Sequence, residues 1–122
     1  MIRIVIVDDH PALRAGLHTV IDSEPGLVFA GESSGSEESL WPLLHSVRPD
    51  VVLLDYHLPK GDGLQLCYRI TRERPAPRVA IFSAYAGPEL LVAARLAGAA
   101  ALLGKGMGAR ELFEAIRRVK RG

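Results

Sequence analysis

Five residues with chemically useful side chains each follow a short apolar run of the sequence. They are two neighbouring aspartates, a third aspartate, a serine and a lysine: Asp8, Asp9, Asp55, Ser83 and Lys105. If each apolar run is a strand of one parallel sheet, these residues lie just past the carboxyl ends of the strands, where open α/β sheets bind ligands. Three carboxylates, a hydroxyl and an amine would then meet at one edge of the sheet.

Such a cluster predicts a magnesium site that supports phosphoryl transfer. Three crowded carboxylates raise one another's pKa unless a cation is present, and oxygen-only ligands of this kind suit Mg²⁺. A carboxylate beside Mg²⁺ can attack phosphorus, because the metal neutralises the charge of the incoming phosphoryl oxygens. Asp55 is the best-placed nucleophile, and Lys105 and Ser83 can hold the remaining oxygens.

Each member of the cluster, taken alone, also has an ordinary structural explanation. Acidic residues often end strands, and Lys105 can simply pair with one of them, as in structural ion-pair networks. The joint occurrence favours a functional site, because independent strand ends rarely supply all five residues in the right order. The negative charges of the adjacent residues Asp8 and Asp9 also repel each other, which is unfavourable without a cation.

Five runs rich in β-branched or aliphatic residues predict the strands that position these side chains. They recur at near-regular spacing, at residues 2–7, 27–30, 51–54, 79–82 and 101–103. The runs are continuous rather than alternating in polarity, as expected for strands that are buried on both faces.

The segments between these runs have the periodicity of helices. Apolar residues recur at helical spacing within residues 13–21, 40–47, 64–70 and 112–119, and the segment 88–101 is apolar almost all round, which favours an interaction face. Pro11 and Pro88 suit first helical positions, and Ser36 suits an N-terminal cap. The alternation predicts a (βα)₅ architecture, in which a doubly wound parallel sheet is covered by helices on both faces.

The composition indicates one globular domain. The chain has 122 residues, which we expect to form a single domain 1–122, and 15 Lys and Arg against 14 Asp and Glu leave a formal net charge of +1. This balance gives no reason to expect nucleic acid or membrane as a direct partner. Because no apolar stretch approaches the roughly 20 residues of a membrane-spanning helix, we expect a cytoplasmic protein.

Cysteine and histidine are too sparse for a motif of their own. Cys67 is the only cysteine, which excludes an intramolecular disulfide, and its apolar neighbours indicate a packed thiol. The four histidines show no two-apart or four-apart pairing, so that a transition-metal site would require the fold to assemble them: His10, His18, His45 and His57.

Two segments of the sequence resemble one known family. The segment 5–11, VIVDDHP, is similar to the opening of response regulator receiver domains of bacterial two-component systems, especially the NarL/FixJ (LuxR-type) subfamily. The segment 55–63, DYHLPKGDG, resembles the phosphoacceptor loop of that family. Ser83-Ala84, the segment 97–99 and Lys105 extend the resemblance over essentially the whole chain.

The resemblance implies both a fold and roles for the site residues. The fold would be flavodoxin-like (CheY-like), with strand order 2-1-3-4-5. Asp55 would be the phosphoacceptor, and Ser83 and Lys105 would bind the phosphoryl group. Mg²⁺ would be held by Asp55, directly by Asp9, through water by Asp8, and by the backbone carbonyl of His57.

The resemblance also implies a signalling switch rather than a metabolic enzyme, one that catalyses only its own phosphoryl transfer and dephosphorylation. A sensor histidine kinase would supply the phosphoryl group, and activation would produce a homodimer. Transcription, and any contact with DNA, would depend on a helix-turn-helix output domain that we expect to be absent from this chain. Leu58, Leu102 and Gly106 depart from the family, in which Met, an aromatic residue and Pro are frequent at these positions.

Three other classes of protein share parts of this pattern. A phosphatase of the haloacid-dehalogenase type normally needs a second aspartate two residues after the first, where this chain has His57. A nucleotide- or flavin-binding module would be expected to place a Gly-rich or Ser/Thr-rich phosphate loop after the first strand. A receiver that is no longer phosphorylated and serves only as a docking module is favoured by Leu102, but the intact cluster argues against it.

Overall fold

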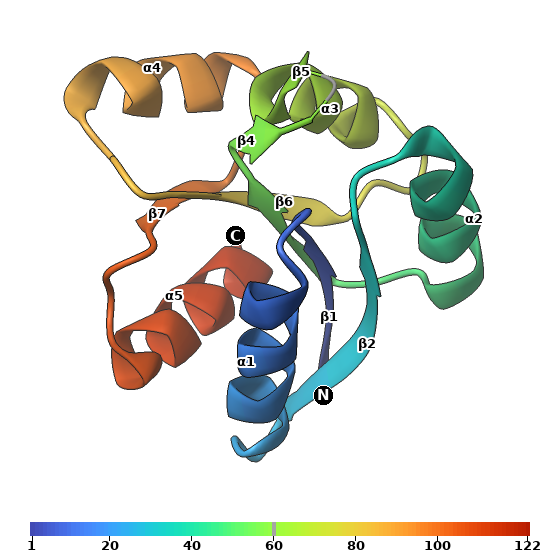
Figure 1. The fold of residues 1–122 in the computed structure, drawn as a ribbon, viewed down its shortest axis with the longest axis vertical. Helices are drawn as coiled ribbons and strands as arrows, with labels where there is room; N and C mark the ends of the chain where they lie inside the picture. The colour runs from blue at the N-terminus through green and yellow to red at the C-terminus, as the bar shows by residue number, and fades with distance from the viewer. Residues whose placement is uncertain (60) are drawn as a thin grey trace.

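A sheet of five parallel strands forms the centre of the protein (Figure 1). The computed structural model describes residues 1–59 and 61–122; Lys60, part of the segment that resembles the phosphoacceptor loop, lies outside the described residues. The strands pair in the order β2-β1-β3-β6-β7, and every pair is parallel. Their bounds are Ile2–Val7 for β1, Leu27–Ser33 for β2, Val51–Asp55 for β3, Arg78–Ser83 for β6 and Ala101–Gly104 for β7.

This order confirms the expected fold, because β6 and β7 are the fourth and fifth of the predicted strands. Two further strands, β4 (His57–Leu58) and β5 (Gly61–Asp62), form a small antiparallel hairpin just beyond β3. The sequence did not predict this hairpin, since strands of two residues are too short to produce a periodic pattern.

Helices cover both faces of the sheet, with α1 and α5 on one face and α2, α3 and α4 on the other (Figure 1). Their bounds are Pro11–Asp22 for α1, Glu37–Val47 for α2, Gly63–Thr71 for α3, Pro88–Leu96 for α4 and Ala109–Arg121 for α5. In the described parts of the chain, no helix combines the length and the apolar character that crossing a membrane would require.

Successive residues of a strand enter two different cores. Ile4 and Ile6 of β1 pack in the core beneath α1 and α5, whereas Val5 and Val7 pack in the core beneath α2, α3 and α4. All four side chains are at most 1% exposed. Full burial of a side chain of this size contributes about 1.5–3 kcal/mol. This two-sided burial explains why the strand runs are continuously apolar.

The helix ends follow the predicted residues. Pro11 and Pro88 begin α1 and α4, and the Ser36 hydroxyl accepts a hydrogen bond from the Ser39 amide at 3.3 Å before α2. The apolar segment 88–101, in contrast, is helical only to Leu96, because Gly98 at a φ of 94° turns the chain out of the helix and toward β7.

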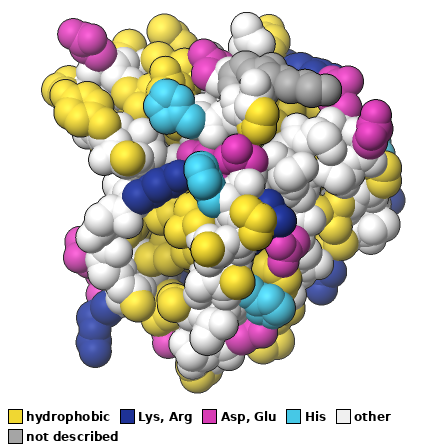
Figure 2. All heavy atoms as spheres, in the orientation of Figure 1, with side chains coloured by type: hydrophobic (Ala, Val, Ile, Leu, Met, Phe, Trp, Pro, Cys, Tyr) yellow, Lys and Arg dark blue, Asp and Glu magenta, His cyan; other side chains and the backbone are white. Residues whose placement is uncertain are grey.

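The outer side of α4 exposes apolar residues, as its all-round apolar character predicted. Val92 and Leu96 are 59% and 78% exposed, and Figure 2 shows hydrophobic side chains gathered over this part of the molecule.

Cys67 of α3 is fully buried, and burial raises the pKa of its thiol to about 11, which confirms a packed rather than a reactive cysteine.

Asp50 ties the amino-terminal edge of the sheet to the end of α5. Its carboxylate accepts a hydrogen bond from the backbone amide of Arg3 at 2.8 Å and another from the Lys120 ammonium at 3.0 Å. Burial alone raises the pKa of Asp50, but the Arg3 amide and the Lys120 charge outweigh it, so the pKa lies below its ordinary value. The ionised carboxylate therefore stabilises the fold.

We predict that Asp50→Ala lowers the free energy of unfolding by about 1–3 kcal/mol near neutral pH, because the Arg3 amide loses its partner. A carboxyl group with a lowered folded-state pKa stabilises in full above its unfolded pKa and loses that effect as pH falls through the folded value. The difference from wild type in urea unfolding should therefore shrink below about pH 4. The control is Asp22→Ala, which removes an exposed pair with His18 and should change little.

Candidate functional site

Four of the five predicted site residues occupy the carboxyl ends of four strands, and Asp9 adjoins the first of them. Asp8 directly follows β1, Asp55 is the last residue of β3, Ser83 is the last residue of β6, and Lys105 directly follows β7. Figure 2 shows acidic, basic and histidine side chains meeting near the middle of the face that this edge presents. Strand alignment alone brings these residues together from distant parts of the chain.

Asp8 is held on all sides at the end of β1. Its side chain is 2% exposed, and one carboxylate oxygen accepts a hydrogen bond from the backbone amide of His10 at 2.8 Å. The backbone of Asp8 donates to the Ser33 carbonyl at 3.0 Å and accepts from the Arg14 guanidinium at 2.6 Å. The local turn therefore fixes this carboxylate before any ligand binds.

Asp55 is the most enclosed acidic residue of the site. Its side chain is 1% exposed, and its Oδ1 lies 2.9 Å from the Lys105 ammonium and 3.3 Å from the backbone amide of His57, which donates to it. The other oxygen, Oδ2, is buried and has no hydrogen-bond partner among the described residues. A buried carboxylate oxygen without a partner is costly, and a bound cation or an incoming group would relieve that cost.

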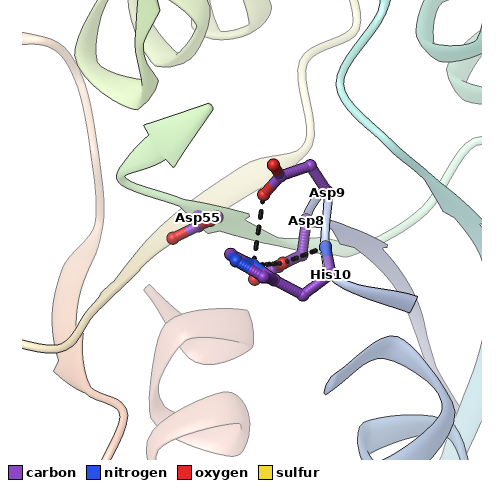
Figure 3. Close-up of side chains that lie close together, drawn as sticks. All are labelled: Asp8, Asp9, His10 and Asp55. Atoms are coloured by element: carbon purple, nitrogen blue, oxygen red, sulfur yellow. Dashed lines mark hydrogen bonds and ion pairs between the residues drawn. The ribbon is translucent and has the colours of Figure 1, made fainter. Parts of the chain in front are cut away.

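The carboxylates meet as the sequence predicted, and a histidine meets them. One potential ligand atom from each of Asp8, Asp9, His10 and Asp55 lies within 4.8 Å of all the others (Figure 3). Oδ1 of Asp9, like Oδ2 of Asp55, is buried without a hydrogen-bond partner among the described residues. The donor set and these two oxygens fit a divalent cation. A role for the His57 carbonyl stays a prediction.

His10 is the site residue that sequence reasoning missed. Its ring Nδ1 lies 2.8 Å from Asp8 Oδ1 and 3.1 Å from Asp9 Oδ1, but only the contact with Asp8 is aligned as a hydrogen bond. That bond, together with the negative charges of Asp9 and Asp8, raises the pKa of His10. The available signal was Pro11, because a proline that begins α1 keeps His10 in the turn beside the aspartates.

Lys105 supplies the positive charge that this edge of the sheet needs. Its ammonium contacts Asp55 at 2.9 Å and Asp8 at 3.4 Å. Burial lowers the pKa of Lys105, but the interactions with Asp55 and Asp8 outweigh burial and raise the pKa above its ordinary value. Lys105 therefore remains charged between the two carboxylates.

Ser83 lies at the predicted strand end, but its hydroxyl bonds to the turn that follows β6 rather than to the acidic residues. Its hydroxyl donates to the Tyr85 carbonyl at 2.7 Å and accepts from the Tyr85 amide at 3.2 Å. Within the described residues, this hydroxyl makes no hydrogen bond to Asp55 or Lys105. The backbone nevertheless links the two strand ends, because the Lys105 amide donates to the Ser83 carbonyl at 2.8 Å.

Gly63 allows α3 to begin directly behind Asp55. A Cβ atom at Gly63 would lie 2.4 Å from the Asp55 carbonyl oxygen and 3.0 Å from Cα of Tyr56. The Gly63 amide donates to the Tyr56 carbonyl at 2.6 Å, so this close approach is part of the local structure. The phosphoacceptor-like segment contains this glycine, but its packing against Asp55 is visible only in three dimensions.

Comparison with protein families matches residues 4–117 to the response regulator receiver domain. The chain belongs to this family. The receiver domain is 34% identical over its full 122 residues to the DNA-binding transcriptional activator DevR/DosR of Mycobacterium tuberculosis. It is 32% identical over 119 residues to the nitrate/nitrite response regulator protein NarL of Escherichia coli. The expected NarL/LuxR-type relationship is confirmed.

The receiver domain spans little more than half of these relatives, 56% of DevR/DosR and 55% of NarL. Among solved structures, it resembles a LuxR-family two-component response regulator from Aurantimonas sp. SI85-9A1 with a TM-score of 0.91 and 31% identity, covering 100% of this chain and 86% of that one. The response regulator domain of Thermotoga maritima CheB gives a TM-score of 0.87 at 27% identity, covering 100% and 98%. Receiver domains bind Mg²⁺ at an acidic pocket, and they are signalling proteins rather than metabolic enzymes.

We predict that Gly63→Ala lowers the free energy of unfolding by about 1–3 kcal/mol, because the added methyl group meets backbone atoms that cannot move aside freely. The control is Gly16→Ala within α1, where an added Cβ has nothing within 4 Å. That control should stabilise the protein by up to about 1 kcal/mol, since alanine is the better helix former. Equal urea midpoints for the two variants would contradict the close packing at Asp55.

Proposed function

We propose that this receiver domain is a switch that a histidine kinase activates by transferring a phosphoryl group to Asp55. The observation that supports this most directly is Oδ2 of Asp55, a buried carboxylate oxygen with no hydrogen-bond partner in the described chain. It belongs to a cluster with two further carboxylates, and Lys105 contacts the other oxygen of the same side chain. A nucleophile and the groups that neutralise its target thus share one pocket.

The carboxylates of Asp8, Asp9 and Asp55 would hold Mg²⁺, which supplies neutralisation of phosphoryl oxygen charge when it is bound. Oδ1 of Asp9 accepts no aligned hydrogen bond from the described residues, although His10 Nδ1 lies 3.1 Å from it, and this free acceptor supports direct coordination. Both oxygens of Asp8 are already engaged by His10 and Lys105, which supports contact through water. Membership of the receiver family supports the backbone carbonyl of His57 as a further ligand.

Ser83 would couple the phosphoryl group to the rest of the domain. Its hydroxyl must give up the hydrogen bond that it donates to the Tyr85 carbonyl before it can donate to a phosphoryl oxygen, and that release loosens the turn between β6 and α4. Leu102, half-buried in β7 against the core of α2, α3 and α4, has no hydroxyl to expose or bury. We therefore propose that α4 and its preceding turn carry the change.

The output of the switch would be transcription. DevR/DosR is described as a DNA-binding transcriptional activator, and this receiver domain corresponds to little more than half of it. We propose that a helix-turn-helix domain completes the whole protein, that activation favours a homodimer, and that DNA is contacted only through that further domain.

The phosphorylation site is tested by incubation with acetyl phosphate and Mg²⁺, followed by mass spectrometry. We expect one added phosphoryl group on the wild-type protein and none on Asp55→Asn, because the amide cannot act as the nucleophile. Asp22→Asn is the control, since Asp22 is an exposed residue of α1 that pairs with His18. Labelling of Asp55→Asn at the wild-type level would refute the assignment.

The metal ligands are tested by calorimetric titration of Mg²⁺ into Asp9→Ala and Asp8→Ala. We expect Asp9→Ala to lose more than about tenfold in affinity and Asp8→Ala to lose less, because only the first variant removes a direct oxygen ligand. Thermal melts of both variants without metal establish that they are folded. Equal losses, or the reverse order, would contradict these roles.

A further inference from the structure

The acidic pocket contains a nitrogen ligand in addition to its carboxylates. Nδ1 of His10 lies 2.8 Å and 3.1 Å from oxygens of Asp8 and Asp9, and Figure 3 shows the imidazole ring beside these side chains. The His10 ring is also 62% exposed, so it can turn without disturbing the core. The pocket therefore offers one imidazole and three carboxylates to a cation.

This donor set suits a different metal from the one that carboxylates alone would select. Mg²⁺ prefers oxygen ligands in an octahedral arrangement, whereas imidazole is a preferred ligand of Zn²⁺ and neighbouring transition metals. Zn²⁺ commonly takes four ligands in a tetrahedron, whose ligand atoms lie roughly 3.4 Å apart for bonds of about 2.1 Å. The four atoms here lie within 4.8 Å of one another, so a modest contraction would produce that geometry.

Two oxygens in the pocket give independent support for a bound cation. Oδ2 of Asp55, on a side chain that is 1% exposed, and Oδ1 of Asp9 are both buried without hydrogen-bond partners among the described residues. Lys105 occupies Oδ1 of Asp55 at 2.9 Å, which leaves Oδ2 available without breaking that ion pair. A metal at this point would satisfy both oxygens at once.

We propose that His10 makes this pocket a Zn²⁺ site, with Asp8, Asp9 and Asp55 as the remaining ligands, in competition with Mg²⁺. Asp8, which would contact Mg²⁺ only through water, would exchange its hydrogen bond with the His10 ring for a direct bond to Zn²⁺. The two ions cannot be bound together, because they share the same carboxylates. The proposal rests on the proposed function in one respect, since Zn²⁺ would displace the Mg²⁺ that the proposed phosphoryl transfer uses from Asp9 and Asp55. Zn²⁺ would thereby disfavour phosphorylation of Asp55.

The test compares His10→Ala with His45→Ala by calorimetric titration of ZnCl₂ and, separately, of MgCl₂. His45 is a matched control, because it is 66% exposed and its Nε2 lies 3.0 Å from a carboxylate oxygen of Glu73, far from the site. We expect the ratio of Zn²⁺ to Mg²⁺ affinity to fall by about tenfold or more in His10→Ala and to stay at the wild-type value in His45→Ala. An unchanged ratio in His10→Ala would overturn the proposal.

A second measurement on the wild-type protein does not depend on any variant. In ¹⁵N-histidine NMR, Zn²⁺ should shift a ring nitrogen of His10 and leave those of His18 and His45 in place, whereas Mg²⁺ should not produce this shift. Shifts confined to other histidines would refute the site. If acetyl phosphate phosphorylates Asp55 but Zn²⁺ does not shift the ring nitrogens of His10, only this inference fails. If Asp55 is not phosphorylated and Mg²⁺ does not bind, the proposed function is refuted instead.

Discussion

Two buried carboxylates at the end of a parallel sheet are the constraint on which the rest of this structure depends. Asp8 and Asp55 are each 2% exposed, and ionised groups so deep in a protein are costly unless opposite charge is close. Lys105 provides that charge by lying between them at 3.4 Å and 2.9 Å. Asp8 directly follows β1, Asp55 ends β3 and Lys105 directly follows β7, so the charge balance exists only when the sheet from β1 to β7 is assembled.

The two hydrophobic cores keep these three charges together, because they fix the positions of the strand ends. Each strand is held from both faces, which leaves its register no freedom to slide, and a slip of one residue would move every side chain to the opposite face. Gly63 adds a local requirement, because α3 can cover Asp55 from behind only where no Cβ intervenes. Asp8 and Asp55 are therefore held in place by their strand ends, whereas His10 and the Ser83 turn can adjust.

The fold could be predicted from the sequence because its evidence is periodic. Continuous apolar runs predicted the five strands of the sheet, and Pro11 and Pro88 correctly predicted where two helices begin. The end of α4 leaves no clear signal in the sequence because alanines continue beyond Leu96, and only the positive φ of Gly98 shows where the helix stops. His10 was missed because its proximity to Asp8 depends on a turn, and turn geometry leaves no periodic pattern. The direction of the Ser83 hydroxyl is likewise a rotamer choice, which residue types do not determine.

The turn after β6 also affects how much of the proposed activated form exists in the absence of phosphorylation. The Ser83 hydroxyl is held by two hydrogen bonds to the backbone of Tyr85, a residue only two positions away. Since such bonds contribute about 1–3 kcal/mol together, the turn should open spontaneously in on the order of a few per cent of molecules. In the proposed switch, those molecules would resemble the activated form although no phosphoryl donor has acted. The level of signalling without phosphorylation would then depend on the strength of one short turn, and a replacement that tightened the turn would lower that level before it weakened the full response.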